Sequence, residues 1–181
     1  MKKAAVLWTW GLLLAVSLRG SVLAQEATLL QQFFVMKAFA PNLERVGVLV
    51  SSDRGEAFKD KLGRASAAVG VKAVVTIVGN LHELSKAYQE LVDVYQVRFI
   101  WVPSDDPVLR SDVAREYLVK KSVTQGVGIL APDKSWVMQG ATLFVGVEGE
   151  KVKPFYNSKS LQALGLSVPE KYADVSTAAS E

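Results

Sequence analysis

The 181-residue chain contains no cysteine and only one histidine, His82. A chain without cysteine forms no disulfide, holds no zinc through thiolates and has no thiol nucleophile. His82 stands at the start of a segment with helical spacing, where a histidine ordinarily lies on the surface. A Ser-His-Asp triad would need that one residue as its base. The sequence therefore favours a protein that is not an enzyme.

Two further absences concern partners that carry phosphate. The sequence has neither G-x-G-x-x-G nor G-x-x-x-x-G-K-[ST], the loops that hold nucleotide phosphates through backbone N–H groups. It also has no cluster of lysine and arginine that could follow a nucleic-acid backbone. We therefore expect no cofactor and no nucleic-acid partner.

The first 24 residues have the organisation of an export signal. A positive start, Met1 to Lys3, precedes an apolar core over 4–18 and the small-residue pattern Val22-Leu23-Ala24. We expect cleavage before Gln25 and a location outside the cytoplasm; the alternative is an uncleaved membrane anchor. Three basic residues and no acidic residue leave with the signal, so 18 basic and 18 acidic residues remain. The basic character of the full chain therefore indicates nothing about its partners.

The remaining chain alternates short apolar runs with segments of helical spacing. The run over 45–53 has no polar face, as expected of a strand covered on both sides in a parallel sheet. The alternation predicts an α/β domain of three layers, with a mostly parallel sheet between helices. The expected strands are 45–50, 72–79, 97–102 and 126–131, with a hairpin of 141–147 and 151–156; the expected helices are 26–40, 58–69, 81–95, 108–121 and 162–166.

After the signal the chain is long enough for one domain and too short for two of ordinary size. We predict a signal peptide over 1–24, a lead-in helix over 25–41 and a single lobe over 42–169. The last residues, 170–181, are rich in serine and alanine and are expected to form a flexible tail.

Ligands of open parallel sheets bind beyond the carboxyl ends of the strands. Here those ends lead into loops that begin at Ser51, Pro103 and Pro132. The hydroxyls of Ser51 and Ser52, with the free N–H groups of the helix that follows, suit a ligand carboxylate. This arrangement favours small organic acids or amino acids as ligands.

Three aspartates, Asp105, Asp106 and Asp133, also follow the strands. Their carboxylates could bind a hard cation or cap the helices that come next. Asp106 precedes Pro107, and proline is favoured at the first position of a helix, so we interpret Asp106 as a cap. For Asp105 both roles, cation ligand and helix cap, remain open.

Two tryptophans lie near the same strand ends. Trp101 lies within a strand and is expected in the core. Trp136 lies just past a strand end beside Asp133 and Ser135, where it either forms one wall of a ligand site or is a buried structural residue.

Four segments resemble one known family when they are taken in order. They are 42–52 (NLERVGVLVSS), 99–106 (FIWVPSDD), 129–141 (ILAPDKSWVMQGA) and 157–169 (NSKSLQALGLSVP). This order is similar to that of the periplasmic substrate-binding components of ABC transporters, in the group described as tryptophan/tyrosine-type. The last segment is the most specific of the four.

The resemblance implies a Rossmann-like fold and a ligand site at the strand ends. Members of the family have two such lobes that close on a ligand, and this chain is similar only to the second. A turn between Val147 and Phe155 stands where the family has a helix and a return crossing to the first lobe. By resemblance the ligand-binding loops map to Ser51, Ser52, Asp53, Ser104, Asp105, Asp133 and Ser135. We add Trp136 to the candidate ligand-binding residues and expect no metal site.

Within that set, the resemblance implies that Asp105 faces the amino group of a ligand. Two positions depart from the family pattern, because Asp106 stands where asparagine is usual and Lys134 where an acidic residue is common. Both departures indicate a changed ligand chemistry.

We therefore expect a periplasmic solute-binding or sensing protein that is reduced to one lobe. Its ligand is expected to be a small amino acid or organic acid. The missing wall of the site would come from a second copy or from a membrane permease or sensor. The alternative is an interaction module without a ligand that docks a membrane transporter or sensor component.

Overall fold

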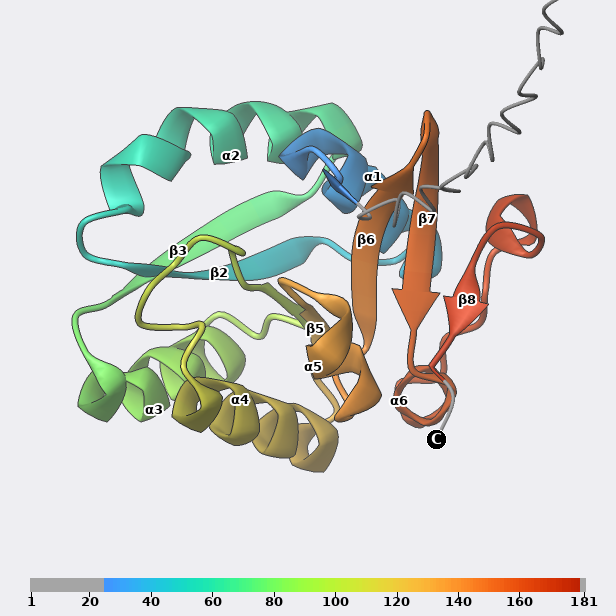
Figure 1. Ribbon diagram of the computed structural model, residues 1–181. Coiled ribbons are helices and arrows are strands. Elements are labelled where there is room, and N and C mark those ends of the chain that lie inside the picture. Colours follow the sequence, from blue (N-terminus) through green and yellow to red (C-terminus); the bar gives the residue numbers. More distant parts are fainter. Residues whose placement is uncertain (1–24, 180–181) are drawn as a thin grey trace, which may run out of the picture.

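The computed structural model describes residues 25–179, so the predicted signal segment over 1–24 lies outside the described residues. One sheet lies between two layers of helices (Figure 1). The strands are β1 Gln25–Glu26, β2 Arg45–Ser51, β3 Lys72–Val78, β4 Phe99–Trp101, β5 Gly128–Leu130, β6 Leu143–Glu148, β7 Lys151–Tyr156 and β8 Thr177–Ala178. The helices are α1 Leu29–Phe39, α2 Gly55–Val69, α3 Leu81–Gln89, α4 Asp112–Gln125, α5 Lys134–Met138 and α6 Ser158–Ala163, with a π-helical turn Glu90–Val94 after α3 and a 3-10 turn Glu170–Tyr172.

The strand order in the sheet is β3-β2-β4-β5-β6-β7-β8, and β1 pairs antiparallel with β6. Strands β3, β2, β4, β5 and β6 are mutually parallel, whereas β7 returns antiparallel to β6. The chain moves outward from β2 to β3 and then crosses back to β4 on the other side of β2. This reversal opens a crevice at the carboxyl ends of β2 and β4, where ligands of such sheets bind.

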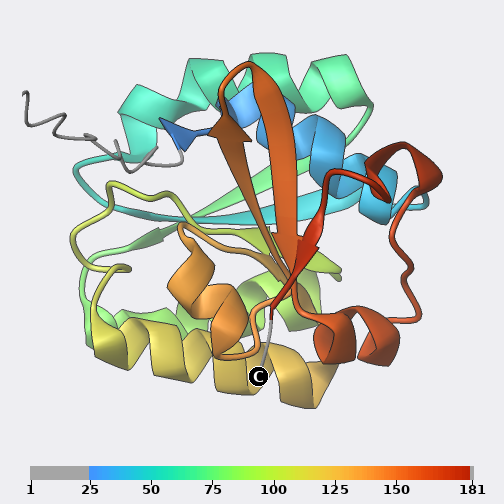
Figure 2. The same ribbon diagram turned by 45° about the vertical axis from the view of Figure 1, so that its right-hand side comes forward.

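Helices α1 and α2 cover one face of the sheet, and α3, α4 and α5 cover the other (Figure 2). Each layer has its own buried cluster, one around Phe33 and Trp101 and one around Tyr88 and Trp136. Every position of β2 after Arg45 is buried, as the absence of a polar face predicts. The predicted fold class, a three-layer α/β domain with a mostly parallel sheet, is confirmed. Within residues 25–179 no helix has the length and apolar character needed to span a membrane.

Several boundaries differ from the sequence prediction, and helix α5 was not predicted. Helix α4 begins at Asp112 with Ser111 as its cap, and residues 107–110 form turns where a helix from 108 was expected. The described part of the predicted tail over 170–181 also makes contacts with the domain: the ring of Tyr172 stacks on Phe39 at 6.0 Å, and β8 pairs with β7. Aromatic packing and strand pairing therefore hold this segment on the domain.

The ring of Tyr88 is fully buried in the α3 and α4 layer, and its hydroxyl has no hydrogen-bond partner among the described residues. Its ring meets Tyr117 edge to face at 6.1 Å. Because an unpaired buried hydroxyl costs about 1–3 kcal/mol, we expect Tyr88→Phe to leave the free energy of unfolding unchanged or to raise it by about 1 kcal/mol. Urea unfolding at pH 7 measures this change.

The same variant should alter the response to alkaline pH. Burial raises the pKa of Tyr88 above the ordinary value of 10.0. Above about pH 10 the unfolded chain releases this proton while the folded chain keeps it, so stability falls as pH rises. Tyr88→Phe should reduce that fall. The control is Tyr117→Phe, which removes a hydroxyl that donates to Ser85 Oγ at 3.0 Å and should cost about 1 kcal/mol. If both variants lowered the free energy of unfolding equally at pH 7, the Tyr88 hydroxyl would have a hydrogen-bond partner, contrary to the structure.

Candidate functional site

The crevice at the carboxyl ends of β2 and β4 holds a cavity of about 400 Å³. It is built by the start of α1, by one face of α2, and by β4 with the loop that follows it. The topology alone points to this place, since the direction of the strand order reverses between β2 and β4. The lining residues are Ala27, Thr28, Leu29, Gln32, Phe58, Lys61, Trp101, Pro103, Ser104 and Asp105.

One wall of the cavity is aromatic. The rings of Phe58 and Trp101 meet edge to face, with centroids 5.5 Å apart, and Phe33 also meets Trp101 edge to face at 6.2 Å. Trp101 is 3% exposed, as expected of a core residue, and its indole N–H donates to Gln32 Oε1 at 2.6 Å. Gln32 Nε2 in turn donates to the carbonyl of Ala27 at 2.8 Å. These contacts fix the start of α1 against β4.

The charged groups of the cavity lie at its rim. Asp105 forms an ion pair with Arg54, with 2.9 Å between Oδ2 and Nη1, and the two side chains are about half exposed. Arg54 Nη2 also donates to the backbone carbonyl of Asp105 at 3.4 Å. Lys61 is exposed on α2. An exposed ion pair contributes little free energy, so a ligand amino group can replace Arg54 at the Asp105 carboxylate at small cost.

Asp106 ties together the two loops that frame the crevice. Its carboxylate is fully buried and accepts hydrogen bonds from the N–H of Ser51 at 2.6 Å and from those of Val108 and Leu109 at 3.0 Å. The predicted capping role is confirmed, although the capped element is the turn over 107–110 and not α4. The role of Asp106 is therefore to position the end of β2 beside the loop after β4.

The first predicted loop makes its polar contacts within itself. The Ser51 hydroxyl donates to Asp53 Oδ1 at 2.6 Å, and this hydrogen bond lowers the pKa of Asp53 below its usual value. Ser51 is buried, whereas Ser52 and Asp53 are exposed. None of the three lines the cavity. Of the eight predicted ligand-binding residues, the cavity brings together Ser104 and Asp105.

The third predicted loop lies apart from the cavity. Asp133 caps α5 and accepts from the N–H of Ser135 at 2.8 Å and from its hydroxyl at 2.5 Å. The Trp136 side chain is 1% exposed and belongs to the cluster in the α3 and α4 layer. Trp136 therefore does not line this cavity, and its burial favours the structural alternative. Within residues 25–179 there is no group of three or more metal-ligating side chains.

Sequence reasoning missed Gln32, Phe58 and Lys61 as lining residues. Phe58 has the spacing of a core residue on α2, and in the structure it also lines the cavity. Lys61 lies one helical turn after Phe58 and therefore on the same face of α2. Once Phe58 is known to line the cavity, this spacing predicts that Lys61 lines it too. Gln32 comes from α1, and no local pattern connects that helix with β4.

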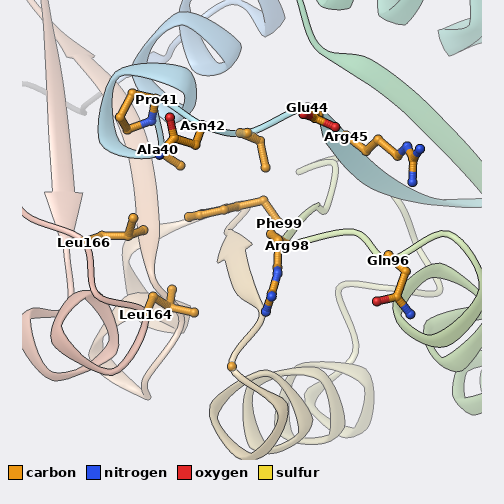
Figure 3. A pocket seen from close by; sticks show the side chains of 12 residues that line it. Ala40, Pro41, Asn42, Glu44, Arg45, Gln96, Arg98, Phe99, Leu164 and Leu166 are labelled. Carbon is orange, nitrogen blue, oxygen red and sulfur yellow. The ribbon is translucent and has the colours of Figure 1, made fainter.

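A second cavity, of about 410 Å³, lies at the opposite edge of the sheet (Figure 3). The carboxyl ends of α1, α4 and α6 reach it at Ala40, Gly126 and Leu164. Arg45 and Arg98 also line it, and Arg45 Nη1 donates to the carbonyl of Tyr95 at 3.2 Å. Positive side chains are favourable beside the carbonyls of helix ends, which explains the two arginines without a ligand. We therefore place the candidate site at the first cavity.

No family model matches the chain, and no curated protein matches it in sequence. Solved structures do match it in fold. One is an ABC domain in complex with L-Trp from Streptococcus pneumoniae, with a TM-score of 0.70 and 19% identity over 83% of this chain and 60% of that one. A second is a conserved domain protein from Vibrio cholerae, with a TM-score of 0.71 and 16% identity over 85% and 60%.

A third is the ligand-free, open structure of a substrate-binding protein with adhesive properties from Clostridium difficile, with a TM-score of 0.64 and 18% identity over 82% of this chain and 58% of that one. The chain spans about 60% of the length of these structures. At such low identity the likeness concerns the fold. The chain has the Rossmann-like α/β fold that substrate-binding proteins use for a lobe.

Proposed function

We propose that the chain is a periplasmic solute-binding protein whose site is the cavity at the carboxyl ends of β2 and β4, and that it binds its solute without converting it. The observation that carries this proposal is the cavity itself, which combines an aromatic wall with charged groups of both signs at the topological switch point. The fold likeness to a substrate-binding protein and to an ABC domain in complex with L-Trp supports the same function.

The lining residues indicate a small amino acid or organic acid as the ligand. The half-buried Phe58 ring offers an apolar surface for the body of the ligand, and the buried Trp101 supports that ring from the core. Lys61 suits a carboxylate, and Asp105 suits an amino group once Arg54 is displaced. Because binding pockets bury most of their ligand, the open side needs a further wall. A second lobe, a partner subunit or a membrane permease would supply that wall.

We expect thermal melting to identify the ligand. The protein is purified after export, and mass spectrometry first tests whether the chain begins at Gln25. A panel of amino acids and organic acids is then added. A ligand at one hundred times its dissociation constant raises the free energy of unfolding by about 2.7 kcal/mol, which shifts the melting temperature by several degrees.

Site variants connect the shift to the cavity. Asp105→Ala and Phe58→Ala should each weaken binding by roughly tenfold or more, because each removes one of the contacts that orient the ligand. The matched control is Asp112→Ala. The exposed Asp112 also forms an ion pair, at 2.7 Å with Arg115, but on α4 away from the cavity. Unchanged binding in both site variants would show that the site lies elsewhere.

The second candidate function is a docking module for a membrane transporter or sensor component. The observation that favours it is an apolar pair on α1, where Leu30 and Phe34 are 42% and 47% exposed and lie one turn apart. Two results together would favour docking over solute binding. No compound would shift the melting temperature, and the protein would capture a permease or sensor that the Phe34→Ser variant does not capture.

A further inference from the structure

Strand β3 is a long, unprotected edge of the sheet. Within residues 25–179 it pairs only with β2 and forms one end of the strand order (Figure 1). Val75 and Ile77 are 42% and 54% exposed, although both are apolar and β-branched. The strand has seven residues without proline or glycine, and its one charged residue is Lys72 at the start. Proline, a bulge or a central charge, which usually prevent edge pairing, are therefore missing from β3.

The backbone of β3 presents hydrogen-bonding groups to solvent in a regular pattern. The N–H of Lys72 donates to the carbonyl of Glu44, just before β2, at 2.8 Å. The backbone groups of Lys72 therefore point toward β2. Because this direction alternates along a strand, the N–H and C=O groups of Ala73, Val75 and Ile77 point outward. Another strand can bind to all three residues.

We propose that β3 pairs antiparallel with β3 of a second copy of this chain, about a two-fold axis at Val75. In this register Val75 faces its own equivalent, and Ala73 faces Ile77 of the other copy. All three residues point their backbone groups outward, so each of these pairs exchanges two N–H···O bonds. A contact that is the same on both copies closes after two and forms a dimer.

The side chains in this register match in polarity. Ala73 packs against the cluster beneath α2, and a Cβ added to Gly55 at the start of α2 would lie 3.4 Å from Ile77. The outward residues of β3 therefore place their side chains on the α2 face. Pairing sets Val75 against Val75 and Ala73 against Ile77, and such apolar cross-strand pairs stabilise a sheet.

The charges at the two ends of β3 favour a second copy over an unrelated strand. Lys72 begins the strand, and Glu83 lies beyond its end, where the glutamate accepts from the N–H of Gly79 at 2.9 Å. Antiparallel pairing about Val75 sets Lys72 opposite Val78 of the other copy, one residue from that Gly79. Each copy supplies one lysine and one glutamate, so the favourable contact forms twice in the dimer.

Sedimentation of the exported protein over a range of concentrations tests the proposal. An interface of one strand per copy is small, so we expect a monomer–dimer equilibrium and not a permanent dimer. Val75→Lys puts like charges opposite each other at the two-fold axis and should raise the dissociation constant by roughly tenfold or more. Val123→Lys is the control, since Val123 is 57% exposed on α4 and far from β3 in sequence. A monomer at every concentration would overturn the proposal.

Cysteine cross-linking tests the register independently of affinity. The chain has no cysteine, so an introduced thiol is unique. Val75→Cys should form a disulfide-linked dimer with itself under mild oxidation. Ala73→Cys and Ile77→Cys should cross-link efficiently only when the two variants are mixed. Equal cross-linking of each variant with itself, or none for Val75→Cys, would overturn the two-fold pairing. Neither experiment depends on solute binding, so the two proposals can fail separately.

Discussion

Trp136→Ala should lower the free energy of unfolding by about 3–5 kcal/mol, the range found when a large buried aromatic residue is truncated in a core. Trp136 is 1% exposed and anchors the five-residue helix α5 to the sheet. A domain of this size is ordinarily stable by about 5–15 kcal/mol, so the variant should lose much of its stability. Urea unfolding measures this loss. The slope of the free energy of unfolding against urea concentration should stay unchanged.

The control for this variant lies on the same helix. Met138 is 62% exposed, so Met138→Ala should change stability by no more than about 0.5 kcal/mol. If Trp136 were instead a ligand wall open to solvent, its truncation would weaken solute binding and leave the unfolding free energy nearly unchanged. That pair of results would contradict the buried position.

Asp106→Ala should cost about 3 kcal/mol or more. The variant leaves three backbone N–H groups, those of Ser51, Val108 and Leu109, without their acceptor in a fully buried place. Hydrogen bonds to a charged group are also stronger than neutral ones. Because the carboxylate ties β2 to the loop after β4, solute binding should weaken along with stability. Chemical unfolding and melting with ligand measure the two effects.

A matched control for Asp106 is Asp133. It also caps a turn of helix, but it is only partly buried and accepts from the N–H and hydroxyl of one residue, Ser135, so Asp133→Ala should cost about 1 kcal/mol. Asp106→Asn should lie between the two, because one amide oxygen can still accept from Val108 and Leu109. An Asp106→Ala loss no greater than that of Asp133→Ala would mean that the buried donors find other partners.

The layout of the sheet could be predicted from the sequence because it depends on local patterns. The apolar run of β2 leaves no polar face, and the repeats of helical spacing after it fix the order of elements. The start of α4 could not be predicted in the same way. Asp106 and Ser111 both have the chemistry of a helix cap, and the choice between them rests on the hydrogen bond from Ser51, a residue 55 positions earlier in the chain.

The candidate site was predictable in its place and less so in its residues. Parallel strands put the end of β4 at the edge where the cavity lies, and Ser104 and Asp105 line it. The other walls come from α1 and α2, and only the packed structure shows which faces of these helices meet the crevice. Trp136 was equally ambiguous, because a tryptophan after a strand can point into the core or away from it.

The exposed edge at β3 also determines how two solute sites would be oriented. Antiparallel pairing turns the second copy around, so the carboxyl edge of one sheet continues as the amino edge of the other. The two crevices would then open in opposite directions along the joined sheet. A dimer of this kind can present only one crevice at a time to a flat membrane, and neither copy covers the open side of the other.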